Sequence, residues 1–72
     1  MRYKLFDRVA LAKDVPECNL RPGAVGTVVE TYPATGGLEV EFTDDEGETI
    51  AVLTLDVEEV RKLTTIEANR AG

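Results

Sequence analysis

The sequence contains neither histidine nor tryptophan, and Cys18 is its single cysteine. Histidine is the commonest general base near neutral pH and the commonest transition-metal ligand, so its absence removes the usual catalytic and zinc-binding arrangements. A lone cysteine cannot form a disulfide within the chain, and an unpaired thiol in a domain this small indicates a reducing compartment. We therefore expect a cytoplasmic protein in which Cys18 is a bystander.

Long hydrophobic runs are also absent. Residues 1–8 lack the apolar core of a signal peptide, and no stretch approaches the roughly 18 apolar residues that a membrane-spanning helix needs. We expect no membrane association.

Positive charge is scarce: the sequence has 8 Lys and Arg and 14 Asp and Glu, which gives a net charge of -6 over 72 residues. A chain of this length forms one small domain. An acidic surface repels phosphate backbones and anionic lipids at long range. The charge balance therefore favours a basic protein as partner and disfavours nucleic acid.

Alternation of apolar and polar residues dominates the readable segments, and residues that favour strands are frequent. It is clearest at 38–43, where Leu38, Val40 and Phe42 share the face opposite the glutamates. The segment 48–55 is apolar on both faces, which predicts a central strand and the most protected element. Further strands are expected at 8–12, 24–32 and 61–63, with a hairpin turn at 44–47 and a helical turn at 56–60 that Asp56 caps.

Gly26 interrupts the long segment 24–32. A glycine inside a strand marks a bulge, a bend or a close backbone approach, so we expect a phase shift near this residue. The pattern leaves open whether Val25 and Thr27 or Val28 face the core, because a slip of one residue exchanges the two faces.

These elements predict an all-β fold, a single small five-stranded SH3-like barrel with a short helical turn before the last strand. The barrel occupies residues 1–63, and residues 64–72 are expected to form a flexible C-terminal tail. A barrel of this size fills its interior with side chains, which leaves no shaped pocket for catalysis. We expect a protein that is not an enzyme and takes no cofactor.

Four strings, at residues 5–11, 23–32, 39–42 and 54–56, resemble a family of very small bacterial proteins known only as a domain of unknown function. The resemblance covers residues 5–63. It implies a free-standing SH3-type barrel, encoded in some members beside a second small protein in toxin-and-antitoxin fashion. Residues 23–30 also resemble, more distantly, the glycine-containing strand of KOW modules and the barrel of the nitrile hydratase β subunit. The latter likeness implies an accessory domain of a metalloenzyme.

Acidic residues are the main candidates for a binding surface. The run at 44–48 lacks the alternating ligands of a calcium loop, so we interpret it as a solvated hairpin turn. Glu39 and Glu41 lie on the outer face of their strand, with Glu30 expected on a neighbouring one. They form either an ordinary polar face or an acidic recognition patch.

The four aromatic residues are Tyr3, Phe6, Tyr32 and Phe42. Phe42 shares the phase of the core, and Tyr32 belongs either to core packing or to an exposed binding surface. Phe6 is expected to seal one end of the barrel.

Our first hypothesis is a non-enzymatic protein-interaction module, an antitoxin-like or immunity-like partner of a neighbouring gene product. Homo-oligomerisation through an exposed edge strand is a further arrangement that the sequence allows. The expected partner-binding residues are Glu39, Glu41, Asp44, Asp45, Glu46 and Tyr32. The second hypothesis is a KOW-like RNA-associated or ribosome-associated module that uses Arg2, Lys4, Arg8, Arg61 and Lys62.

Overall fold

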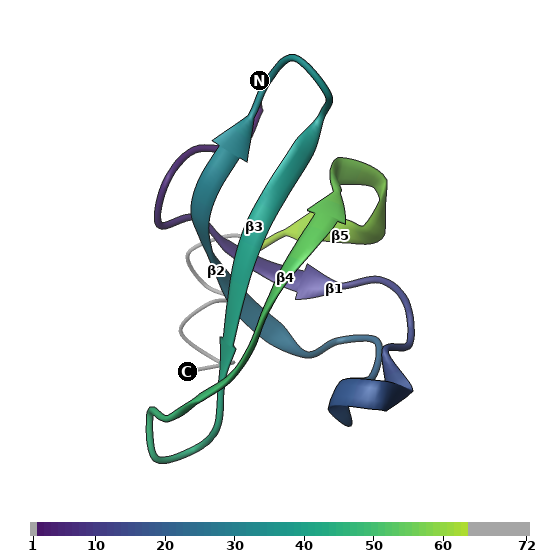
Figure 1. Cartoon of the computed structure of the whole chain (residues 1–72), viewed down its shortest axis with the longest axis vertical. Helices are drawn as coiled ribbons and strands as arrows, with labels where there is room; N and C mark the ends of the chain where they lie inside the picture. The colour runs from purple at the N-terminus through teal and green to yellow at the C-terminus, as the bar shows by residue number, and fades with distance from the viewer. Residues whose placement is uncertain (1, 64–72) are drawn as a thin grey trace.

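The computed structural model describes residues 2–63, which form five antiparallel strands in one sheet and two 3-10 turns (Figure 1). The strands are β1 (Arg8–Leu11), β2 (Val25–Tyr32), β3 (Gly37–Thr43), β4 (Thr49–Asp56) and β5 (Val60–Lys62), and the turns are η1 (Pro16–Cys18) and η2 (Val57–Glu59). The predicted all-β fold, with its helical turn before the last strand, is confirmed. The tail predicted at 64–72 lies outside the described residues.

The sheet has the strand order β4-β3-β2-β1-β5. Figure 1 shows β1 and β5 crossing behind β3 and β4, so the sheet folds over itself and encloses the core. The core takes residues from every strand and from the first loop: Val9, Leu11, Val15, Leu20, Val28, Leu38, Val40, Phe42, Leu55 and Val60. Burial of these side chains is the main driving force for folding in a chain this short.

β3 alternates as its sequence predicts. Leu38, Val40 and Phe42 are buried, whereas Glu39 and Glu41 lie on the opposite, outer face. β3 pairs with β2 on one side and with β4 on the other, so it lies between these two strands.

The prediction that the strand at 48–55 is central and best protected is wrong. β4 is the end strand of the sheet, and Leu55 is its single buried residue. Ile50 is 47% and Val52 50% exposed. Apolar residues on both faces therefore do not bury β4, because only β3 flanks it and nothing in the described part of the chain covers Ile50 and Val52.

The structure shows which residues of β2 face the core, a point that the sequence leaves open. Val28 faces the core with Gly26, and the register shift lies between Val28 and Glu30 rather than near Gly26. Gly26 instead marks a close approach, since a Cβ atom there would lie 2.6 Å from Cγ1 of Val40. One extra residue in β2 after Val28 gives Glu30 and Tyr32 the outer face, opposite Glu39 and Gly37.

The N-terminal turn corrects a second prediction. Phe6 does not seal one end of the fold as expected but is 76% exposed. The backbone N–H of Asp7 donates to the carbonyl of Lys4, and within this turn Phe6 has φ +73°. That left-handed conformation normally favours Gly or Asn.

η2 is held by a capping box. The side chain of Asp56 accepts a hydrogen bond from the N–H of Glu58, and Glu59 accepts one from the N–H of Asp56 at 2.8 Å. The arrangement satisfies backbone donors that the short turn leaves free. It places Val57 and Val60 against the core, as their spacing predicts.

Candidate functional site

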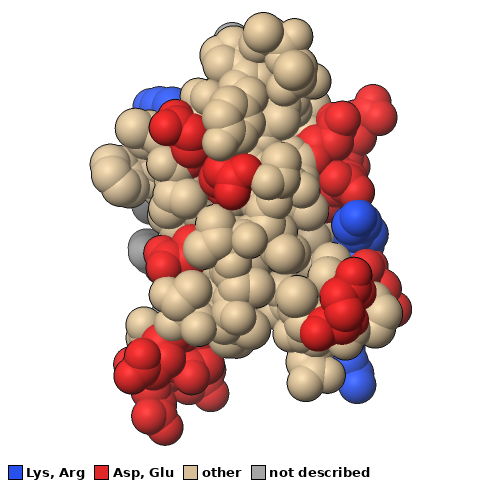
Figure 2. All heavy atoms as spheres, in the orientation of Figure 1, with Lys and Arg blue, Asp and Glu red and all other residues tan. Residues whose placement is uncertain are grey.

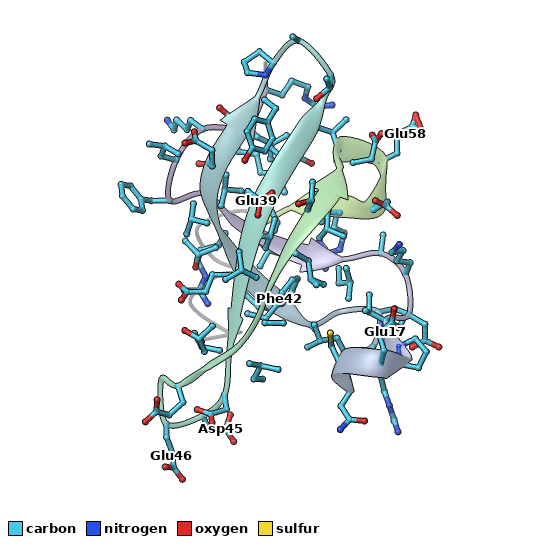
Figure 3. The ribbon with its side chains drawn as sticks, in the orientation of Figure 1. Glu17, Glu39, Phe42, Asp45, Glu46 and Glu58 are labelled. Carbon is cyan, nitrogen blue, oxygen red and sulfur yellow. The ribbon has the colours of Figure 1, made fainter. Side chains whose placement is uncertain are left out.

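The outer face of β2, β3 and β4 brings together part of the predicted site. Glu30 of β2 is opposite Glu39 of β3, and Glu39 is opposite Thr54 of β4. Side chains of directly opposed residues stand on the same face of a sheet. Glu39 therefore has a neighbour on each side, and Figure 3 shows it on the face of β3 that turns towards the viewer.

Tyr32 joins this group at the end of β2, where it is 42% exposed. Partial burial raises the pKa of its phenol, and the charges of Glu39 and Glu30 and a hydrogen bond with Glu39 raise it further. Tyr32 therefore lies on the surface and is not part of the core. Tyr32 supplies an aromatic ring beside two carboxylates.

Hydroxyl groups hold the two outer glutamates of β3. Thr49 Oγ1 donates to Glu41 Oε2 at 2.7 Å, and Thr54 Oγ1 donates to Glu39 Oε1. Such hydrogen bonds orient the carboxylates without neutralising them. Lys13 and Lys62 form ion pairs with Glu59 and Asp7, away from this face.

The turn between β3 and β4 forms a separate acidic group. Asp44 accepts hydrogen bonds from the N–H groups of Glu46 and Glu48, both at 2.9 Å, and Gly47 has φ +82°. The predicted hairpin turn is confirmed, and Asp44 is a structural residue within it. Asp45 and Glu46 stand at its tip (Figure 3), about 20 Å along the strand from Glu39 at the rise of an extended chain.

The predicted partner-binding residues therefore form an elongated surface rather than one cluster. Figure 2 shows acidic side chains at the β3–β4 turn, over the middle of the β3 face and beside η2, with Lys and Arg only at the margins of the view. We call Tyr32, Glu39 and Glu41 with the neighbouring Glu30 the acidic face. Asp45 and Glu46 extend it at one end.

The basic residues of the second hypothesis are partly engaged within the chain. Lys62 Nζ lies 3.2 Å from Asp7 Oδ2, 3.0 Å from the carbonyl oxygen of Arg2 and 5.9 Å from the ring centroid of Tyr3. Burial works to raise the pKa of Asp7, but the N–H of Lys4 and the ammonium of Lys62 lower it overall. This contact ties the N-terminal segment to β5.

Hollows in the surface include one of about 650 Å³ between β2 and the acidic turn, with Arg8, Asp44 and Asp45 among its lining residues. Another, about 400 Å³, is lined by Tyr3, Pro33, Val57 and Glu58 among others. Within residues 2–63, no group of three or more Cys, Asp and Glu side chains is arranged to hold a metal ion. In the same part of the chain no helix is long and apolar enough to cross a membrane.

Sequence reasoning missed the exposed apolar side chains next to the acidic face. Val52 is opposite Glu41, and Ile50 lies where the register of β3 and β4 shifts. The sequence does carry a signal, since β4 is apolar on both faces. This pattern fits an edge strand with exposed apolar side chains as well as it fits a buried central strand.

Comparison with known proteins gives one finding. No curated protein and no solved structure matches the chain. The family model DUF4926, described as a domain of unknown function, matches residues 5–62. This match spans all five strands, so the chain belongs to the DUF4926 family.

Proposed function

We propose that this protein is a non-enzymatic interaction module that binds a basic protein through the acidic face. The support is the grouping of Tyr32, Glu30 and Glu39 on one exposed sheet surface, where hydroxyl groups orient carboxylates that no cation of the acidic face's own strands neutralises. Such a surface steers a positively charged partner and then contacts it with an amphipathic ring. A small basic protein encoded beside this one, as in a toxin-and-antitoxin pair, is the partner to test first.

Matched variants test whether the face itself matters. Each removes two negative charges: Glu39→Gln with Glu41→Gln on the face, Asp45→Asn with Glu46→Gln at the turn, and Glu17→Gln with Glu58→Gln as control. Figure 3 places Glu17 and Glu58 away from Glu39, at η1 and η2. The tagged full chain captures partners from native lysate, with and without nuclease, and mass spectrometry identifies them.

We expect a basic protein that survives nuclease and is retained by the control. The face variant should lose it, with an affinity at least about tenfold weaker for two charge contacts, and the turn variant should lose less. Equal losses in all three variants would mean that net charge alone attracts the partner and would contradict a specific face. Capture of RNA or ribosomal proteins that nuclease releases would favour the nucleic-acid hypothesis instead.

A further inference from the structure

β4 has main-chain groups directed away from the sheet. In an antiparallel pair, opposed residues alternate between those whose main-chain groups bond across the pair and those whose groups point outwards. The N–H of Val57 donates to the carbonyl of Gly36, which makes this opposed pair a bonded one. Along the register from that pair, Val52 and Thr54 occupy the alternate positions, so their N–H and C=O groups point to the free edge.

These edge groups have no partner in the described part of the chain. Among the backbone hydrogen bonds that residues 2–63 form outside the strand ladders, none involves Val52 or Thr54. The neighbouring side chains of Ile50 and Val52 are about half exposed. Open donors and acceptors flanked by uncovered β-branched side chains make a template for an added strand.

The glutamates beside the free edge of β4 indicate that a basic segment binds there. Val52 is opposite Glu41 and Thr54 opposite Glu39, so both carboxylates lie one strand inside the edge. A strand added to β4 would run about 5 Å from it and about 10 Å from β3. A lysine or arginine on its outer face would cover Val52 with its methylene stem and carry its charge towards Glu41.

A second copy of the chain fits less well. Pairing two β4 edges would place the two β3 strands about 15 Å apart, with no basic side chain beside either set of glutamates on β2, β3 or β4. Each copy carries a net charge of -6, and a net charge far from zero disfavours association of identical chains.

We infer that the free edge of β4 receives an extended segment of the basic partner, which continues the sheet while its lysine or arginine side chains reach over Val52 to Glu41. This rests on the proposed function, because it specifies how the same basic partner binds. Backbone pairing supplies affinity and the glutamates supply selectivity.

Two synthetic peptides separate strand addition from charge attraction. The first alternates lysine and valine, and the second has the same sequence with every backbone nitrogen methylated. Methylation removes the N–H donors from both edges of the peptide but keeps every charge. In calorimetric titrations against the full chain, the first peptide should bind, and the methylated one should bind at least about tenfold more weakly.

Variants of Val52 test the same edge from the protein side. Val52→Pro removes an N–H that points to the free edge, a position at which proline leaves the β3 ladder intact. It should weaken binding of the first peptide about tenfold and leave the methylated peptide unaffected. Val52→Thr keeps the N–H and should bind like the wild type. If Val52→Pro does not fold, the two peptides against the wild-type chain decide the question.

Three other results of these experiments would contradict the addition of a partner strand to β4. Equal binding of both peptides would leave charge attraction alone, and the proposed function would stand without the β4 edge. Absence of binding by either peptide at low salt would remove the inferred mode. A concentration-dependent dimer that Val52→Pro abolishes would assign the edge to a second copy. Failure of the proposed function is seen separately, as capture of a protein partner that Glu39→Gln with Glu41→Gln leaves unchanged.

Discussion

β3 and β4 belong to one hairpin, yet they have opposite relations to solvent. In β3 the apolar side chains are buried and the glutamates face outwards, whereas in β4 apolar side chains occupy both faces and about half of Val52 is exposed. The difference comes from position in the sheet, because β3 has neighbours on both sides and β4 on one. An apolar side chain is therefore buried only where a neighbouring element covers it, and within the described residues nothing covers Val52 as β2 and β4 flank the residues of β3.

The largest effect is expected where β2 presses against β3. A Cβ atom at Gly26 would lie 2.6 Å from Val40 Cγ1 and 2.9 Å from Phe42 Cε1. Gly26→Ala should therefore lower the free energy of unfolding by about 3 kcal/mol, the upper part of the range for overpacked cores. Chemical denaturation measures it.

Gly37→Ala is the matched control, because its nearest contact would be the exposed hydroxyl of Thr35 at 3.3 Å. A loss of similar size in both variants would mean that strand glycines are needed for general reasons and would weaken the contrast.

The same truncation in both strands tests the comparison directly. Val40 is fully buried in β3, so Val40→Ala should cost about 2 kcal/mol through lost burial and the cavity left behind. Val52→Ala should change stability by less than about 0.5 kcal/mol, as expected for a surface position. Thermal and urea unfolding of the two variants provide the measurement, and equal losses would show that the outer face of β4 is buried in solution.

Phe6 extends the contrast to a second exposed apolar residue, which carries a backbone cost. Its φ of +73° disfavours a bulky side chain, and Asn adopts this conformation readily. Phe6→Asn should raise the free energy of unfolding by about 1 kcal/mol. Leu5→Asn makes the same change in polarity at the neighbouring residue, which has no positive φ, and should give no gain in the same melts.

The smallest effect on stability is expected at η2, where Glu59 completes the capping box with Asp56. The N–H of Asp56 and the ammonium of Lys13 lower the pKa of Glu59 below its ordinary value of 4.5. Because the folded-state pKa is depressed, this stabilisation is complete above the ordinary pKa and is lost as pH falls through the lowered value. Glu59→Gln should cost about 0.5 kcal/mol at neutral pH and flatten the acid limb of the stability profile.

Glu58→Gln removes the same charge from the same turn and serves as the control. Thermal unfolding between neutral and acidic pH should show the acid limb unchanged in this variant. If the Glu59→Gln profile overlaps it, the charge of Glu59 does not contribute to stability.

Strand positions could be predicted because they depend on local pattern. The alternation at Leu38, Val40 and Phe42 and the capping residue Asp56 fix two elements without tertiary information. The place of β4 in the sheet could not be predicted, because strand order depends on which edges meet in space. The exposure of Phe6 escaped prediction for a similar reason, since its turn is set by the hydrogen bond from its N–H to Val28.

The grouping of the candidate residues on one surface could be predicted only in part. Tyr32, Glu39 and Glu41 do share one face, but Asp44 serves the turn, and Asp45 and Glu46 lie at a distance. Sequence alternation identifies a face of one strand. It does not say how far along the sheet the members of that face spread.

The extra residue in β2 decides which side chains reach the acidic face. The register shift takes up Val29, so that Glu30 and Tyr32 stand opposite Glu39 and Gly37 on the outer face. If β2 instead continued in regular alternation through Val29, Glu30 and Tyr32 would turn towards the core and Thr31 would turn outwards. The composition of the acidic face therefore depends on a backbone irregularity as much as on the identity of its residues.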